Sequence, residues 1–134
     1  MRYLCVLVCL VGLLSCSPSV PPSITATAGK QFQLKLGQTA KLEDGLTVTF
    51  DDVPSDGRCS SCTASFYALI NLHVTPPGKA PVLVSISTPP VSKIEGDIAP
   101  YQVQYIALTP QHNTPNDNLN RAEYAVTLVI TKGE

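Results

Sequence analysis

Apolar and polar residues alternate with a period of two along most of the chain after residue 30. Apolar residues at every second position give a β-strand one dry face, whereas an amphipathic helix needs a period near 3.6. The alternation predicts strands over 31–36, 46–50, 66–74, 82–86, 101–108 and 124–130, with a short strand over 40–42. Turn-forming residues separate these runs, and Asp44-Gly45 is a strong hairpin signal.

This pattern predicts an all-β fold for residues 31–134. Twelve prolines, no tryptophan and no convincing amphipathic helix agree with strands joined by rigid turns. Six or seven short strands favour a single antiparallel β-sandwich that is immunoglobulin-like in general architecture. A small β-barrel is the alternative arrangement. The run 66–74 is the longest apolar alternation, so we expect it to be a central strand.

Two segments lack periodicity and are predicted to be loops. Pro54 to Cys62 contains many turn formers, and Thr109 to Arg121 is polar with two prolines and four asparagines. Loops held on a rigid sheet often carry recognition. The sequence does not decide whether the two loops share one end of the sandwich.

The first residues of the chain form a different kind of segment. Met1-Arg2-Tyr3 carries one positive side chain, and Leu4 to Leu14 is an unbroken run of apolar, cysteine or glycine residues. As a helix this run would span roughly 16 Å, about half of a ~30 Å hydrocarbon core. It therefore predicts an export signal and not a membrane span.

Leu13-Leu14-Ser15-Cys16 resembles the lipobox of bacterial lipoproteins. The resemblance implies cleavage after Ser15, a diacylglyceryl thioether on Cys16 and acylation of the new amine, so that acyl chains hold the protein in the membrane. Residues 1–15 would then be the signal peptide and 16–30 a flexible tether. Ser17, where an aspartate would retain the protein at the inner membrane, favours the outer membrane of a Gram-negative envelope. An ordinary secretory signal is the alternative.

Cysteine counting agrees with lipidation. Two of the five cysteines lie in the signal, which leaves Cys16, Cys59 and Cys62 in the mature chain. An odd thiol is a liability in an oxidising compartment, and acylation of Cys16 would remove it. We therefore predict a structural disulfide between Cys59 and Cys62. Two alternatives are a redox dithiol, although no helix signal follows Cys62, and a zinc site with His73 and His112, whose spacing is unlike that of a zinc finger.

A second resemblance covers roughly residues 32–132. Phe32-x-Leu34-x-x-Gly37-Gln38, Asp56-x-Arg58-Cys59 and the closing Tyr124-x-x-x-Leu128 are similar to a group of small bacterial secreted or lipid-anchored domains of obscure role. Those domains carry an Asp-Ser-Arg-Cys-Pro segment, whereas this chain has Gly57 and Ser60 at the serine and proline positions. The resemblance supports the fold and the location. We expect Arg58 to be displayed on a solvated loop or paired with Asp56 or Asp52.

Charge and motifs exclude several function classes. Removing the signal, with its one basic residue and no acid, changes the formal net charge from −1 to −2, which does not favour nucleic acid as a partner. Asn116 to Asn120 resembles half of a calcium loop but lacks its glycine and glutamate. The chain has no serine-hydrolase elbow, zinc-protease motif or phosphate-binding loop, and adjacent carboxylates such as Asp51-Asp52 point to opposite strand faces.

These observations predict a lipid-anchored protein of the cell envelope with a non-enzymatic binding or structural β-sandwich domain. We expect no cofactor or metal, and an envelope protein is the expected partner. One alternative is an inhibitor or protective factor that inserts its disulfide-braced loop into an envelope or host enzyme. A weaker one is a thiol redox protein that uses Cys59 and Cys62.

Overall fold

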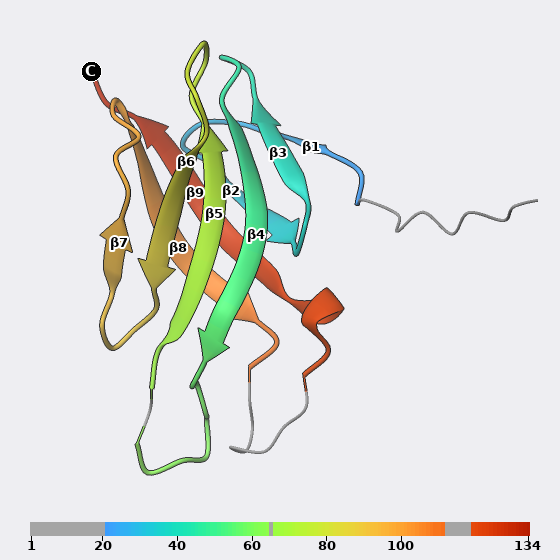
Figure 1. Cartoon of the computed structure of the whole chain (residues 1–134), viewed down its shortest axis with the longest axis vertical. Coiled ribbons are helices and arrows are strands. Elements are labelled where there is room, and N and C mark those ends of the chain that lie inside the picture. The colour runs from blue at the N-terminus through green and yellow to red at the C-terminus, as the bar shows by residue number, and fades with distance from the viewer. Residues whose placement is uncertain (1–20, 65, 112–118) are drawn as a thin grey trace, which may run out of the picture.

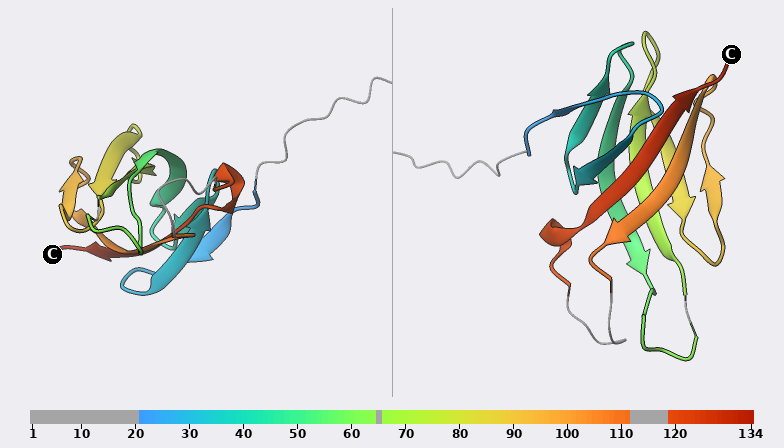
Figure 2. Two further views of the ribbon diagram at one scale, coloured as in Figure 1. Left: turned by 90° about the horizontal axis from the view of Figure 1, so that it is seen from below. Right: turned by 180° about the vertical axis from the view of Figure 1, so that it is seen from behind.

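The computed structural model describes residues 21–64, 66–111 and 119–134, and these residues form two stacked β-sheets (Figures 1 and 2). The strands are β1 (Ile24–Ala26), β2 (Gln31–Lys35), β3 (Thr39–Leu42), β4 (Thr47–Asp56), β5 (Ala68–Thr75), β6 (Val82–Ser87), β7 (Lys93–Glu95), β8 (Tyr101–Thr109) and β9 (Ala125–Lys132), with a short 3₁₀ helix, η1 (Arg121–Glu123), before β9. The predicted all-β sandwich is confirmed, and the barrel alternative is wrong because the sheets do not close on one another.

The larger sheet has the order β1-β3-β4-β5-β6-β7, and the smaller one has the order β2-β9-β8. β5 is a central strand of the larger sheet, as its long apolar alternation predicts. The predicted hairpin at Asp44-Gly45 joins the antiparallel strands β3 and β4, with Gly45 at φ 94°. Glycine reaches this left-handed conformation without the steric cost of a side chain.

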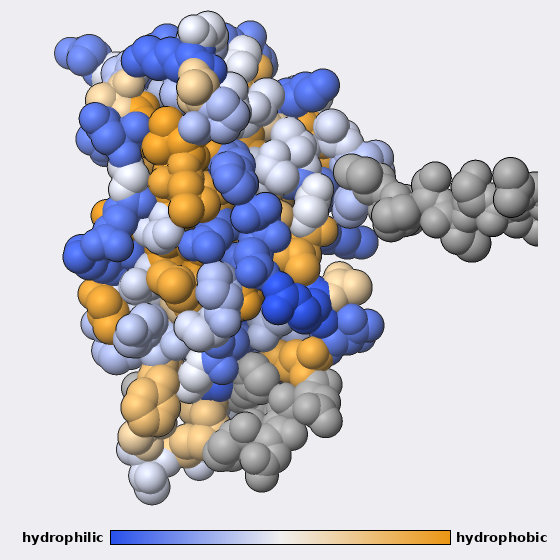
Figure 3. All heavy atoms as spheres, in the orientation of Figure 1, coloured by the Kyte–Doolittle hydropathy of each residue, from blue (hydrophilic) through white to orange (hydrophobic). Residues whose placement is uncertain are grey.

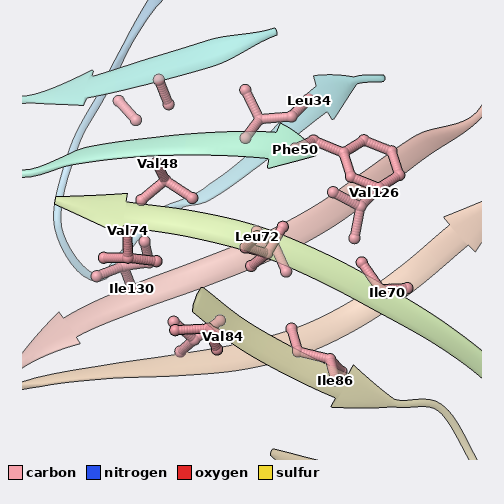
Figure 4. Packing of buried hydrophobic residues seen from close by; sticks show 14 of the residues in the cluster. Leu34, Val48, Phe50, Ile70, Leu72, Val74, Val84, Ile86, Val126 and Ile130 are labelled. Carbon is pink, nitrogen blue, oxygen red and sulfur yellow. The ribbon is translucent and has the colours of Figure 1, made fainter. Parts of the chain in front are cut away.

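The core lies between the two sheets (Figure 4). Alternate side chains of β4, β5 and β6, such as Phe50, Leu72 and Ile86, pack against Leu34 of β2 and Val126 of β9. These side chains are at most 1% exposed. Apolar burial of this kind contributes about 1.5–3 kcal/mol for each large side chain, so the core fixes the strands that carry the loops.

The domain begins earlier than the predicted boundary at residue 31. β1 lies inside the predicted tether, where it pairs in parallel with β3 and buries Ala26 to 4% exposure. The Gln38 amide also donates a hydrogen bond to the Pro22 carbonyl, at 2.9 Å. The tether prediction is therefore wrong for residues 24–26, because a three-residue strand is too short to show a period. The predicted signal peptide and residues 16–20 lie outside the described residues.

Three other strand predictions need correction. β7 was not predicted, since it has only three residues and all of them are exposed. β4 extends through Pro54 into the predicted loop, and Pro54 lies at a register irregularity where no ladder N–H is needed. β5 begins at Ala68, so Phe66 lies in the preceding loop and is 63% exposed.

No helix in the described ranges is long and apolar enough to cross a membrane.

Candidate functional site

The loop between β4 and β5 contains the predicted disulfide pair. The Cys59 and Cys62 sulfur atoms lie at bonding distance, and their Cα atoms are 5.4 Å apart. The described residues between Cys62 and β5 form bends and irregular chain and no helix. The geometry therefore fits a brace within the loop, and the helix N-terminus that activates a redox dithiol is not found there.

Arg58 lies next to this disulfide and makes a buried ion pair with Asp56. Its Nη2 atom is 2.6 Å from Asp56 Oδ2, and its Nε atom is 2.8 Å from Asp56 Oδ1. The two side chains are only 11% and 5% exposed. The expectation of a solvated, displayed arginine is therefore wrong, whereas the pairing with Asp56 is confirmed. A planar guanidinium suits this bidentate contact because its N–H groups match the two carboxylate oxygens.

The same guanidinium extends to the far side of the sandwich. Nη1 of Arg58 donates to the Leu108 carbonyl at 2.5 Å, and Nη2 donates to the Pro110 carbonyl at 2.8 Å. The Tyr124 hydroxyl donates to Asp56 Oδ2 at 2.8 Å. We call Asp56, Arg58 and Tyr124 the loop clamp, because they tie the disulfide loop to both ends of the segment between β8 and β9.

The loop clamp explains the charge states of its members. Burial raises the pKa of Asp56, but hydrogen bonds from Arg58 and Tyr124 outweigh it and hold that pKa below its usual value. Burial, and then the hydrogen bond to Asp56, raises the pKa of Tyr124 to about 12. Burial lowers the pKa of Arg58, but contact with the Asp56 carboxylate outweighs this effect and raises that pKa above its usual value. All three groups are thus held in the protonation states that their contacts need at neutral pH.

The clamp brings the described ends of the polar loop to the same end of the molecule as the disulfide loop (Figures 1 and 2). Residues 112–118 of the polar loop, including His112 and most of the calcium-like segment, lie outside the described residues. Arg121 pairs with Asp52 of β4 at this end. Asn120 caps η1 by accepting a hydrogen bond from the Ala122 N–H.

A cavity of about 610 Å³ opens beside the disulfide and is lined by Arg58, both cysteines, Ala64 and Phe66, among others. A second cavity of about 530 Å³ shares Arg58, Cys59 and Phe66 with the first and continues toward β8. Figure 3 shows apolar side chains at the lower end of the molecule, where this loop lies. An apolar hollow beside a charged arginine that is already held by Asp56 and two carbonyl groups suits an inserted side chain.

Two other residues considered in the sequence analysis, His73 and Asp44, make contacts that do not involve the disulfide loop. His73 is on the outer face of β5, with Nδ1 3.5 Å from Asp51 Oδ1. Asp44 accepts a hydrogen bond from the Tyr101 hydroxyl at 2.5 Å. The structure therefore does not bring His73 to the two cysteines, as the zinc interpretation requires. No cluster of three metal-binding side chains occurs among the described residues.

Sequence reasoning identified the disulfide and the Asp56–Arg58 pair but missed Tyr124 as their partner. The contact joins residues 68 positions apart, and Arg58 extends 50 and 52 positions to its two carbonyl acceptors. One local signal was present. Tyr124 stands at the start of the apolar alternation that predicts the last strand. A tyrosine buried there needs a hydrogen-bond partner for its hydroxyl group.

Comparison with known proteins adds no relative. The chain matches no family model, no curated protein sequence and no solved structure. The lipobox and the resemblance to small secreted domains therefore remain predictions.

Proposed function

We propose that this protein is a lipid-anchored component of the cell envelope that binds another envelope protein, without catalysis, through its disulfide-braced end. The observation that carries the binding proposal is the loop clamp together with Phe66. A buried ion pair holds the disulfide loop against the end of β8, and a 63% exposed aromatic side chain stands beside an apolar cavity there.

Rigidity matters because ordering a flexible loop on binding costs affinity. The disulfide restricts four consecutive residues, and Arg58 holds the loop to β8. Phe66 in turn lies against Gly57, since a Cβ atom at residue 57 would lie 2.7 Å from the Phe66 Cβ atom. An exposed aromatic residue held in place by such packing has the character of an interface anchor.

A photo-crosslinking amino acid tests this surface in cells that make the full-length protein. Placed at residue 66, it should give one discrete crosslinked product with another envelope protein. Placed at Lys41, an exposed residue on β3, it should give no such product. Adding Arg58→Ala should abolish the crosslink from residue 66, because the loop would lose its attachment to the Leu108 carbonyl.

Equal crosslinking from residues 66 and 41, or no discrete product from residue 66, would contradict the proposal. The inhibitor alternative uses the same surface, because a braced loop with an exposed aromatic tip can enter the active site of an enzyme. It is distinguished by the partner: the activity of a crosslinked enzyme should fall when the purified protein is added, and Phe66→Ala should prevent that fall.

A further inference from the structure

The open edge of β8 is a second feature that the binding end does not explain. Among the described strands, β8 pairs with β9 alone, so its other edge faces outward. The Gly133 N–H donates to the Pro100 carbonyl at 2.7 Å, which identifies the even-numbered residues at the start of β8 as the hydrogen-bonded partners of β9. The backbone groups of Val103 and Tyr105 must therefore point to the open edge.

This open edge is bounded at both ends. At one end, the Tyr101 N–H donates to the Ile98 carbonyl at 2.9 Å. At the other end, the Leu108 carbonyl accepts from Arg58. A short window centred on Gln104 remains between these two contacts, long enough for a few residues of another strand.

The edge lacks the usual protection against strand pairing. Natural edge strands commonly carry charges or prolines that repel a second strand. β8 reads Tyr-Gln-Val-Gln-Tyr-Ile-Ala-Leu-Thr and contains neither. Its register irregularity falls between Tyr105 and Ala107, at the far limit of the window and not at its centre.

The flank beside this edge is hollow and apolar. Two cavities of about 330 and 280 Å³ lie between β8 and β7, and both are lined by Ile94 and Val103. Ile94 is 44% exposed although it lies opposite the buried Ile86 in the β6–β7 ladder. Figure 3 shows apolar and charged side chains side by side along the edge where β7 lies.

The charges of β7 are arranged so that a second copy can complement them. Lys93 and Glu95 are the only charged residues of the strand; they stand one on each side of Ile94 and pair with each other within one copy. When two copies of this strand run antiparallel about Ile94, each lysine faces the glutamate of the other copy. The uncharged β8 is likewise compatible with an antiparallel copy of itself about Gln104. Each strand can thus pair with an antiparallel copy of itself, β7 about Ile94 and β8 about Gln104. The two points lie close together, because Ile94 and Val103 line the same cavities.

We propose that the β7–β8 flank binds a second copy of this chain and forms a two-fold symmetric dimer. Val103 of each copy hydrogen-bonds with Tyr105 of the other, the two Gln104 residues meet on the axis, and Ile94 is covered. The result is a continuous six-stranded sheet built from two copies of β2-β9-β8. β1, where the chain enters the domain, lies at the opposite edge of its sheet from β7, so this entry point is remote from the contact.

In-cell disulfide trapping of the full-length chain tests the dimer. In a non-hydrogen-bonded antiparallel pair the Cα atoms lie about 4.5 Å apart, which a disulfide can bridge. Gln104→Cys should therefore give a product of twice the monomer mass on non-reducing gels that disappears on reduction. Gln102→Cys is the matched control: it is also exposed, but the two copies of residue 102 would stand about 13 Å apart along the strands.

A charge exchange tests the contact independently. On the Gln104→Cys background, Lys93→Glu makes β7 repel its copy, so crosslinking should fall about tenfold. The double change Lys93→Glu with Glu95→Lys restores complementarity and should restore the crosslink. Lys93 and Glu95 are 64% and 61% exposed in their side chains, so neither change should affect folding. Sedimentation of the unsubstituted, detergent-solubilised protein should give the mass of a dimer.

Several results would overturn the proposal. These are a monomer in sedimentation, equal crosslinking through residues 102 and 104, or a crosslinked product with the mass of a different protein. Failure of the double charge exchange to restore what Lys93→Glu removes would also contradict it. None of these results bears on crosslinking from residue 66, so the dimer and the binding end can fail separately.

Discussion

At the scale of single residues, Arg58 is the side chain on which the binding end depends most. It joins the carboxylate of Asp56 to two carbonyl groups of another segment while almost fully buried. Removing one member of a buried ion pair leaves an unpaired charge without water, which costs more than the pair itself contributes. The ion pair therefore acts chiefly to fix the position of the disulfide loop, and breaking it by removing one partner strongly destabilises the fold.

We predict that Arg58→Ala lowers the free energy of unfolding by about 3 kcal/mol, because the buried Asp56 carboxylate loses the positive charge that compensates it. Arg121→Ala is the control, since Arg121 is 64% exposed in its ion pair with Asp52, and it should cost less than about 1 kcal/mol. Urea denaturation of both variants measures the difference. Equal effects would show that the clamp is no stronger than a surface pair.

The raised pKa of Tyr124 leads us to predict that the folded protein loses stability at high pH. Its pKa is raised to about 12 in the folded protein from an ordinary value of 10.0. A group with a raised folded pKa stabilises the fold below its unfolded pKa, and this contribution disappears as the pH rises through the folded value. The urea midpoint of the wild type should therefore fall between about pH 10 and 12. Tyr124→Phe should lower the midpoint at pH 8 and flatten its fall above pH 10; an unchanged slope would exclude Tyr124 as the cause.

At the scale of elements, period-two alternation identified every strand of four or more residues. Each of these strands has one face in a common core, so burial leaves its signature in the sequence. β1 and β7, with three residues each, are too short to show a period. Strand order also escaped prediction, since the parallel pairing of β1 with β3 depends on contacts that no local pattern records.

The candidate site was predictable to the same degree. Asp56, Arg58 and the two cysteines fall within seven consecutive residues, where local spacing is informative. The carbonyl groups of Leu108 and Pro110 are backbone acceptors, and any residue in their place would offer the same group. The sequence could therefore identify the arginine and Asp56 as a possible pair, but it could not identify the two carbonyl partners or show that the pair is buried.

β1 leads to a prediction about where the folded domain begins. We predict that Ala26→Asp lowers the free energy of unfolding by more than about 2 kcal/mol, because it places a carboxylate in the core where Ala26 is 4% exposed. Thr25→Asp, on the exposed face of the same strand, should change it by less than about 0.5 kcal/mol. Urea denaturation distinguishes this result from that of a tether, in which both changes would be neutral.

At the scale of the whole molecule, β1 changes the expected distance between the domain and the membrane. If lipid is attached at Cys16, seven residues separate it from the first strand at Ile24 instead of the fourteen of the predicted tether. At about 3 Å for each residue in a proline-rich chain, the reach is about 20 Å. The point where the chain enters the domain would then lie within about 20 Å of the membrane surface.

The proposed anchor at Cys16 can be tested without changing the described domain. We predict that Cys16→Ala moves the protein from the membrane fraction to the soluble fraction and abolishes palmitate labelling, because the thiol is the expected site of the thioether. The Cys59–Cys62 bridge closes within the loop between β4 and β5, far along the chain from residue 16, so the soluble variant should keep it and resist alkylation before reduction. Retention in the membrane with no change in labelling would refute the lipobox interpretation. Cells that carry the variant should also lose the crosslink from residue 66, because the binding end would no longer be concentrated beside a membrane-bound partner.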